Sequence, residues 1–452
     1  MTQGPRRMLV VADSDSYIKW GAAFAGQRGG EWHSSLVLVK TPVLPSARQL
    51  DAALTGTPFT ARDVRTIDID DLAELIQRER PHIVLLALRG PLVRVVAPIV
   101  AAMPGRPAII SGFPGLTIPA EPKAIIYREQ CDMIVLHSTR EVREFSANAA
   151  QLGIGMRFAL ARLPFLDDVV RQRTRTDANS IVFAVQAKVP ASREERVQVL
   201  ALLADAARAH SSRRVVVKTR ARRGEAQTHL EQFDLGHLLD QPDVSDSLGG
   251  VPENLVVSDG PMAAHLSRAA ALVTVSSTAA LEAIAQGIPV LLLDDFGVGP
   301  QQINTVFVGS GLFGNAADLA RGDWRHPEPA WLDDNYFHPD QASTVDDRLA
   351  DLVARRAARG LPALERRFNL TGGSLRRAFE RKRRLGHYDR SLSGALSLVV
   401  ALPVRAVVRR ARRIARRLQF ARSPSDTPKT VASVAAGGDV LRRVTLAEEA
   451  AE

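Results

Sequence analysis

Cysteine and long apolar runs are nearly absent from this sequence. Cys131 is the only cysteine among 452 residues, so the chain forms no internal disulfide and no thiol-rich metal site, as is usual in a reducing compartment. The first apolar run, Met8 to Ala12, is shorter than the core of a signal peptide. No apolar run reaches the roughly eighteen residues that indicate a membrane span. The sequence therefore predicts a cytoplasmic protein that does not span a membrane.

Lysine is also scarce, at 7 residues against 52 arginines, and the positive charge is unevenly placed. Residues 376–422 contain 15 basic and 2 acidic side chains, a net charge of +13. The whole chain has a net charge of +10, which leaves −3 for everything outside that segment. A near-neutral body lacks the basic face that binding to a duplex requires. The distribution therefore disfavours a nucleic-acid-binding protein, although the basic segment alone keeps that alternative open.

Several motifs that bind phosphates, metals or cofactors are missing. The chain has no Gly-x4-Gly-Lys-Ser/Thr loop, no His-Glu-x-x-His, no cysteine pair and no Gly-x-Ser-x-Gly. The first predicted strand is followed by Asp13-Ser14-Asp15 rather than by Gly-x-Gly-x-x-Gly. We therefore expect neither a dinucleotide cofactor nor a metal site.

Two series of buried strands alternate with helical segments, in a chain too long for one core. The predicted strands are Met8–Ala12, Ser35–Val39, His82–Leu88, Ala108–Ser111 and Met133–Leu136, then Ile181–Val185, Val215–Lys218, Leu272–Val275 and Val290–Leu293. The polar stretch Arg171–Asn179 separates the two series and reads as a linker. Strands spaced in this way are typical of parallel sheets covered on both faces. The sequence predicts an α/β protein with tandem Rossmann-like domains at residues 1–170 and 178–368, and a ligand between them.

A basic appendage is expected after the second domain, which ends in a helix predicted over residues 346–368. The apolar residues that follow recur at spacings of four and three: Val400, Val404, Val407, Ala411, Ile414 and Leu418. Arginines occupy the other faces of this predicted helix. Such a basic amphipathic helix suits an anionic membrane surface, which residues 396–420 would contact. The alternative is that the stripe packs onto the globular body. We assign residues 369–422 to a basic helical tail and the Ser/Thr/Ala/Gly-rich residues 423–452 to disorder.

The most informative segment runs from Leu272 to Asp294. It predicts a buried strand, a Ser276-Ser277-Thr278 turn, a helix that bears Glu282, and a second buried strand. A hydroxyl-rich turn that leads into a helix offers hydroxyl donors, backbone N–H groups and a positive dipole end to a phosphate. Glu282 lies nearly two turns beyond Ser276, where a carboxylate can reach ribose hydroxyls. The alternative is an ordinary capped helix with a solvated glutamate.

Polar residues also follow strands of the first domain. Asp13 and Asp15 stand after the first strand, where ligands bind in parallel α/β sheets, so either is a candidate general base, and Lys19 is a candidate anion contact. The alternative for the aspartates is helix capping. Gly112 follows a later strand and either lets backbone approach a ligand or forms a tight turn. His137 ends the next strand and is a candidate catalytic group or a structural histidine.

Cations cluster at one strand end in the second domain. Lys218 and Arg220 stand first in Lys-Thr-Arg-Ala-Arg-Arg, where they are placed to neutralise a diphosphate leaving group. The alternative is a solvated loop. His229 follows shortly and is a weaker candidate for hydrogen bonding to the ligand.

The segment Thr274-Val-Ser-Ser-Thr-x3-Glu282-Ala-x3-Gly287-x-Pro289-Val resembles the donor-nucleotide motif of GT-B glycosyltransferases and related enzymes. It is especially similar to that of the non-hydrolysing UDP-N-acetylglucosamine 2-epimerases and of the capsule and teichoic-acid polymer transferases. The resemblance implies phosphate contacts for Ser276, Ser277 and Thr278, and a ribose contact for Glu282.

The resemblance extends to other families in part. The Ser-Ser pair is similar to that of bacterial sialyl- and polysialyltransferases, but Lys218-Thr219-Arg220 stands where those families place a donor-binding His-Pro, which argues against a CMP-linked donor. The Asp-x-Asp spacing at Asp13 is similar to the metal-binding motif of the other large glycosyltransferase fold, where it follows several strands rather than the first. The whole chain, with its basic C-terminal helix, resembles uncharacterised glycosyltransferases of actinobacteria.

The sequence thus predicts a metal-independent GT-B glycosyltransferase without a cofactor. It would move a sugar from a nucleotide-activated donor to a cell-envelope glycan or a lipid-linked acceptor, on the inner face of the cytoplasmic membrane. Its alternatives are a nucleotide-sugar epimerase and a non-catalytic protein that binds nucleic acid or membranes. The sequence makes no prediction of the oligomeric state, the sugar, the base or the stereochemical outcome.

Overall fold

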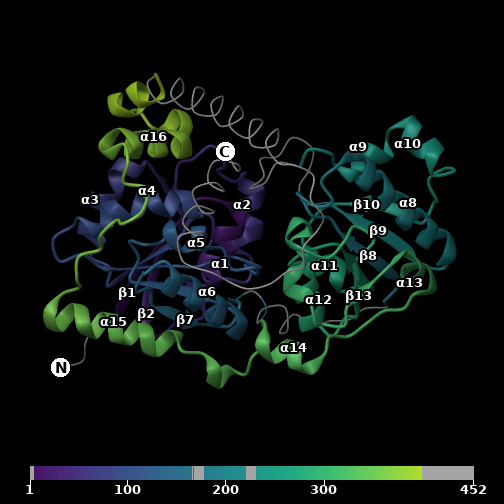
Figure 1. The fold of residues 1–452 in the computed structure, drawn as a ribbon, viewed down its shortest axis with the longest axis horizontal. Coiled ribbons are helices and arrows are strands. Elements are labelled where there is room, and N and C mark those ends of the chain that lie inside the picture. The colour runs from purple at the N-terminus through teal and green to yellow at the C-terminus, as the bar shows by residue number, and fades with distance from the viewer. Residues whose placement is uncertain (1–4, 165, 167–177, 220–230, 400–452) are drawn as a thin grey trace, which may run out of the picture.

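The fold consists of two α/β domains, each built on a parallel sheet (Figure 1). The computed structural model describes residues 5–164, 166, 178–219 and 231–399. The first sheet has seven strands in the order β3-β2-β1-β4-β5-β6-β7, and the second has six in the order β10-β9-β8-β11-β12-β13. The predicted fold class is confirmed. The basic helix at 400–418, the tail at 423–452 and most of the predicted linker lie outside the described residues.

The strands of both sheets are short, and those at the centre are buried over most of their length, as their apolar sequences require. The first sheet contains β1 (Arg6–Ala12), β2 (Trp32–Val39), β3 (Arg65–Ile67), β4 (Ile83–Ala87), β5 (Ala108–Ser111), β6 (Met133–Leu136) and β7 (Phe158–Leu160). The second contains β8 (Ser180–Ala184), β9 (Arg214–Lys218), β10 (Leu255–Ser258), β11 (Ala269–Thr274), β12 (Val290–Leu293) and β13 (Phe313–Gly314).

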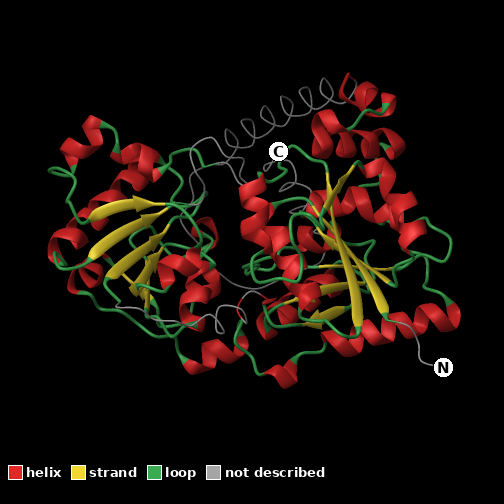
Figure 2. Cartoon of the chain, turned by 180° about the vertical axis from the view of Figure 1, so that it is seen from behind, coloured by secondary structure: helices red, strands yellow, loops and turns green. Residues whose placement is uncertain are grey.

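Helices cover both faces of each sheet (Figure 2). In the first domain they are α1 (Asp15–Gly26), α2 (Ala47–Leu54), α3 (Leu72–Glu79), α4 (Gly90–Ala101), α5 (Pro122–Ile126) and α6 (Thr139–Gln151). In the second they are α8 (Arg193–Ala209), α9 (Leu235–Leu239), α10 (Pro242–Ser247), α11 (Met262–Leu266), α12 (Ala279–Ala285) and α13 (Ala316–Arg321). The C-terminal part contains α14 (Pro329–Asp334), α15 (Val345–Arg359), α16 (Gly373–Leu385) and a helical stretch at 392–399. No helix among the described residues is long and apolar enough to cross a membrane.

Each sheet has a point at which the chain connections reverse direction. In the first sheet this switch point lies between β1 and β4, and in the second it lies between β8 and β11. Ligands of open α/β sheets bind in the crevice at the carboxyl ends of the strands beside such a point. The two switch points therefore mark where a site is expected in each domain.

The chain returns to the first domain after α13. Helix α15 packs against β5 and β7, and α16 packs against α4, so both lie with the first domain in Figure 1. The backbone N–H of Thr344 donates to the carbonyl of Leu160 at 2.9 Å. By these contacts residues 345–385 belong to the first domain, whereas the sequence placed residues up to 368 in the second. The predicted helix over 346–368 also ends earlier, at Arg359, because Gly360 takes a φ of +72° there.

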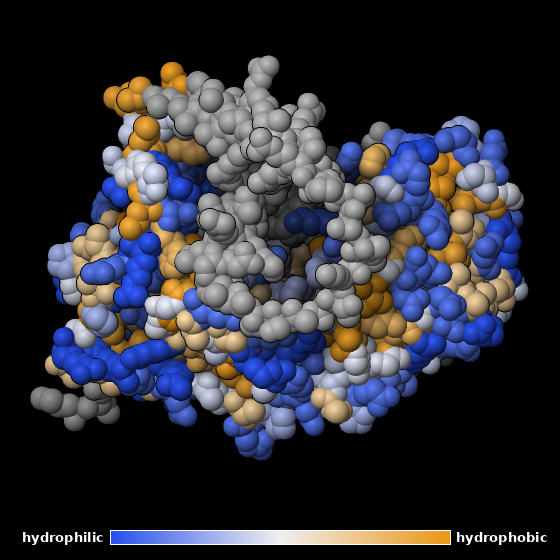
Figure 3. All heavy atoms as spheres, in the orientation of Figure 1, coloured by the Kyte–Doolittle hydropathy of each residue, from blue (hydrophilic) through white to orange (hydrophobic). Residues whose placement is uncertain are grey.

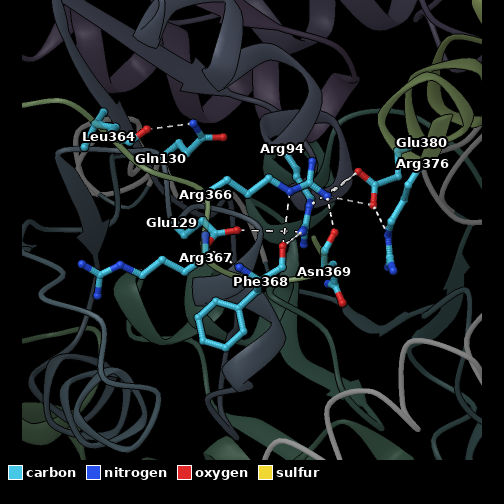
Figure 4. Close-up of polar contacts among 10 residues, drawn as sticks. All are labelled: Arg94, Glu129, Gln130, Leu364, Arg366, Arg367, Phe368, Asn369, Arg376 and Glu380. Carbon is cyan, nitrogen blue, oxygen red and sulfur yellow. Dashed lines mark hydrogen bonds and ion pairs between the residues drawn. The ribbon is translucent and has the colours of Figure 1, made fainter. Parts of the chain in front are cut away.

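A buried polar network fixes this returning segment (Figure 4). Arg94 on α4 donates from Nη2 to the carbonyl of Phe368 at 2.7 Å and lies 3.6 Å from a carboxylate oxygen of Glu380 on α16. Glu129 accepts the backbone N–H groups of Arg367 and Phe368. Because Arg94 and Glu129 have side chains only 4% exposed, this network holds α16 in one place on the first domain.

Candidate functional site

The hydroxyl-rich turn lies at the switch point of the second sheet, directly after β11. Ser276 is fully buried, and its Oγ donates to the carbonyl of Ile303 at 2.6 Å. Ser277 and Thr278 are half-buried; Ser277 Oγ accepts the N–H of Ala279, and Thr278 caps α12 without a side-chain hydrogen bond. Of the three predicted phosphate contacts, Ser276 therefore anchors a neighbouring loop, and the other two residues are partly exposed.

Glu282 connects this turn to the first domain. Its carboxylate lies 3.7 Å from the Nζ of Lys19 on α1, and its side chain is 10% exposed whereas that of Lys19 is 43% exposed. Close by, a Cβ placed on Gly115 would lie 2.9 Å from Cγ2 of Thr278. The loops that follow β1 and β5 of the first domain thus meet the turn and helix that follow β11. In Figure 3, hydrophilic and hydrophobic residues are interspersed over the described surface of both domains.

Arg196 organises the other side of the same switch point and was missed by the sequence analysis. Its guanidinium donates to the carbonyls of Gln186 and Ala187 at 2.8 Å and of Pro190 at 3.0 Å, all in the loop that follows β8. Its Nη1 also donates to the carbonyl of Phe233 at 2.9 Å and to Oε1 of Glu231 at 2.5 Å. All five N–H groups are used, so this loop is held beside the Ser276–Thr278 turn.

The loop after β12 is a second part of the site that the sequence did not indicate. Asn304 is fully buried, accepts the N–H of Gly299 at 2.9 Å, and donates to the carbonyl of Gly297 at 3.1 Å. Because Ser276 bonds to the adjacent carbonyl of Ile303, the turn and this loop are fixed to each other. Glycines and one asparagine are a weak signal in a sequence, since ordinary turns have the same composition.

Lys218 lies at the carboxyl end of β9, one strand away from the switch point. Lys218 and the adjacent Thr219 are both largely buried, and the Lys218 carbonyl accepts the N–H of Val185 in the loop after β8. Arg220 and His229 lie outside the described residues. Of the predicted cations of this strand end, the structure therefore places Lys218 alone.

Asp13 is fully buried at the end of β1 and is paired with Arg89. Arg89 Nε donates to Asp13 Oδ2 at 2.6 Å, and the Arg89 backbone N–H donates to Oδ1 at 3.3 Å. Burial raises the pKa of Asp13, and the charge of Arg89 only partly opposes this rise. Asp15 is half-buried at the first position of α1, where it accepts a hydrogen bond from Ser16. Of the two candidate bases, Asp15 is the more accessible to a substrate.

His137 and Gly112 both serve the packing of Trp20. The His137 ring is fully buried; its Nε2 accepts from Trp20 Nε1 at 2.8 Å, so its Nδ1 carries the proton and donates to the carbonyl of Ala161 at 3.1 Å. Burial lowers the pKa of His137 to about 4. A Cβ on Gly112 would lie 2.5 Å from the Trp20 ring. The structure therefore favours the structural alternative for His137, and it gives Gly112 a role in packing rather than in ligand approach.

The family model described as "Putative glycosyltransferase (DUF6716)" matches residues 8–352. This chain belongs to that family. The match covers both sheets and every described residue of the site. No curated protein matches the chain. Among the described residues, no group of three or more His, Cys, Asp or Glu side chains is placed to hold a metal ion.

The solved structures that match this chain include epimerases and glycosyltransferases. The UDP-GlcNAc 2-epimerase from Methanocaldococcus jannaschii matches with a TM-score of 0.50 and 11% identity, over 76% of this chain and 99% of its own. A protein described as a putative UDP-N-acetylglucosamine 2-epimerase from Listeria monocytogenes gives 0.48 and 12%, over 86% and 98%. A UDP-glucosyltransferase from Polygonum tinctorium gives 0.44 and 13%, over 79% and 95%. At this identity, the likeness to the M. jannaschii enzyme shows a shared GT-B fold, as the sequence predicted.

Proposed function

We propose that this member of a glycosyltransferase family transfers a sugar from a nucleotide-activated donor that is bound at the switch point of the second domain. The observation that supports this most strongly is Glu282, a carboxylate that lies near the domain boundary within two turns of two partly exposed hydroxyl residues. Ser277 and Thr278 would bond a phosphate, and the loop held by Arg196 lies across the switch point from them. Glu282 would accept hydrogen bonds from the ribose hydroxyls.

Positive side chains would replace a metal ion in this proposal. Charge grows on the nucleotide phosphate as the sugar leaves, and fixed cations stabilise that charge without reorganising. Lys19 lies at the domain boundary and Lys218 at a neighbouring strand end, and the sequence adds Arg220. On the acceptor side we propose Asp15, rather than the paired Asp13, as the base that takes the proton from the acceptor hydroxyl.

Replacing Glu282 with alanine should weaken nucleotide binding by roughly 1–3 kcal/mol, because hydrogen bonds from a ligand to a charged group contribute about that much. Isothermal titration of UDP, and of the other common nucleoside diphosphates, measures this directly. Glu253→Ala is the matched control, since it removes an exposed glutamate from the same domain.

Lys19→Ala separates the ion pair between Glu282 and Lys19 from the proposed contact of Glu282 with the ribose. It removes the same ion pair while leaving the carboxylate in place, so a loss confined to Glu282→Ala assigns the ribose contact to Glu282 itself. Equal affinity of the wild type, Glu282→Ala and Glu253→Ala for every nucleotide would remove the basis of the proposal. A sugar epimer formed from the donor without any acceptor would favour the epimerase instead.

We further propose that the acceptor is a cell-envelope glycan or a lipid-linked sugar, reached from the inner face of the cytoplasmic membrane. The helical stretch at 392–399 exposes Leu392, Leu396 and Val399, which are 90%, 61% and 71% exposed. Their spacings of four and three match those of the apolar stripe predicted for residues 400–418. Arg377 and Arg390 nearby in the sequence are exposed as well. Apolar residues beside cations suit an anionic bilayer, in which each cation contributes about 1 kcal/mol.

The double variant Leu392→Asp/Leu396→Asp should lower binding to anionic liposomes by about tenfold or more, because each leucine that enters the bilayer contributes roughly 1.5–3 kcal/mol. Co-sedimentation with vesicles of phosphatidylglycerol and phosphatidylcholine measures this binding. Val251→Asp/Val308→Asp adds the same charge at exposed valines of the second domain and should sediment like the wild type. If both double variants sediment alike, or if salt leaves binding untouched, the membrane proposal fails.

A further inference from the structure

The switch point of the first sheet carries an ion pair that the proposed donor site does not use. Asp13 follows β1, Arg89 follows β4, and the two strands are neighbours, with Ala12 paired to Ala87. The loops after these strands run in opposite directions from that point, which opens a crevice at the carboxyl ends. Arg89 is thus placed where this kind of sheet binds its ligand.

Arg89 follows a strand whose two neighbours lead to segments that contact the second domain. Strand β4 lies between β1 and β5 in the sheet. The loop and helix after β1 reach the second domain through Lys19 and Glu282, and the loop after β5 reaches it through Gly115 and Thr278. The chain therefore leaves the sheet at Arg89 between two strands whose following segments contact the second domain near the Ser276–Thr278 turn.

The Arg89 side chain is fixed at one end and open at the other. Its Nε is held by the fully buried carboxylate of Asp13. Within the described part of the chain, its two terminal nitrogens donate to no protein group, and the side chain is 27% exposed. A guanidinium held in this way presents two parallel N–H groups that match a phosphate or a carboxylate, and little rotamer freedom is left to lose on binding.

The local charge also favours an anion. The guanidinium of Arg128 lies against Gly90, since a Cβ on that glycine would be 3.3 Å from Arg128 Nη1. Within the described ranges, Arg128 bonds only to neutral oxygens, which are those of Ser111, Gly112, Ala124 and Tyr17. Arg89 is paired with Asp13, whereas Arg128 adds a positive charge that no carboxylate of the described residues hydrogen-bonds.

We propose that Arg89 binds an anionic group, a phosphate or carboxylate, of the acceptor. The inference rests on the proposed function, which seats the donor diphosphate on the second domain and leaves the first domain for the acceptor. It adds that the acceptor is itself charged close to the hydroxyl that receives the sugar, as in a glycosyl phosphate or an acidic sugar. Asp13 is then a positioning residue, because it acts by orienting Arg89.

Inorganic phosphate is the probe for this site. The full chain is first saturated with the nucleotide that binds it best, so that the donor site is filled, and phosphate is then titrated against sodium chloride of equal ionic strength. Phosphate should raise the melting temperature of the wild type. Arg89→Gln should weaken phosphate binding at least about tenfold, because a charge-assisted contact is lost. Arg89→Lys keeps the positive charge but loses the two parallel N–H groups. Its phosphate affinity should therefore lie between those of the wild type and Arg89→Gln. Arg78→Gln, at an exposed arginine of the same domain, should match the wild type.

Each outcome decides the inference. Equal phosphate affinity of the wild type and Arg89→Gln overturns it, and so does a loss of nucleotide affinity with unchanged phosphate binding, which would assign Arg89 to the donor phosphate. If Arg89→Gln misfolds because Asp13 is left unpaired, Asp13→Asn/Arg89→Gln replaces it with a neutral pair. Absence of nucleotide binding by the wild type counts against the proposed function alone, and the phosphate comparison is then made on the free protein.

Discussion

Replacing Arg196 with methionine is expected to be the most damaging single change in the second domain. The Arg196 and Glu231 side chains are each 2% exposed and form a buried ion pair. Arg196 also bonds to four backbone carbonyls, three of them in the loop after β8. Removing one partner of a buried pair costs about 3–5 kcal/mol, because the other charge and the carbonyls lose their donor. Thermal and urea unfolding should show that loss.

Arg193→Met is the matched control on the same helix. Arg193 also forms an ion pair, with Asp243, but the two side chains are 37% and 66% exposed. A pair in solvent contributes about 0–1 kcal/mol, so this variant should unfold nearly as the wild type does. If the two variants unfold alike, Arg196 does not hold the loop as described. If Arg196→Met is destabilised but keeps full nucleotide affinity below its melting temperature, the loop after β8 is not part of the donor site.

His137 should make the protein sensitive to acid. Its pKa is lowered to about 4 by burial, whereas an unfolded histidine titrates near 6.5. Because the folded pKa is the lower one, the stabilisation from keeping this ring neutral is complete above about pH 6.5 and is lost as the pH falls toward 4. The difference corresponds to roughly 2–4 kcal/mol. The wild type should therefore lose that much more stability between pH 7 and pH 4 than His137→Gln does.

The control for this pH effect is an exposed histidine. His33→Gln removes one on β2 and should follow the wild-type curve. Parallel curves for the wild type and His137→Gln would contradict the buried, neutral state of His137. A loss of turnover in His137→Gln at unchanged stability would restore its predicted catalytic role.

Much of the fold is visible in the sequence where local pattern decides the structure. Strands β5, β6 and β12 begin and end where their uninterrupted apolar runs predict, because a strand buried on both faces needs such a run. Helix α4 was not predicted from the sequence, because it too is buried on more than one side. It is apolar around most of its circumference and contains Pro98, so it shows no helical stripe.

The rest of the site depends on contacts between residues far apart in the chain. Asp13 and Arg89 are 76 positions apart, and Arg89 looks like any other arginine in a sequence with 52 of them. Arg196 occupies a buried position of α8 that a helical pattern assigns to an apolar residue. The return of α15 and α16 to the first domain likewise follows from packing and not from local composition. The Ser276–Thr278 turn was predictable because its hydroxyls, the glutamate and the flanking strands are contiguous in the sequence.

The central claim is that the second domain binds a nucleotide-activated sugar, and a thermal-shift panel of UDP-, GDP-, CMP-, CDP- and dTDP-sugars tests it most directly. A ligand at 100 times its dissociation constant stabilises a protein by about 2.7 kcal/mol, which is readily measured. We expect at least one nucleotide sugar to raise the melting temperature of the wild type and to lose most of that effect in Glu282→Ala. If no nucleotide sugar stabilises the wild type, or if the shift is equal in Glu282→Ala, the claim is contradicted.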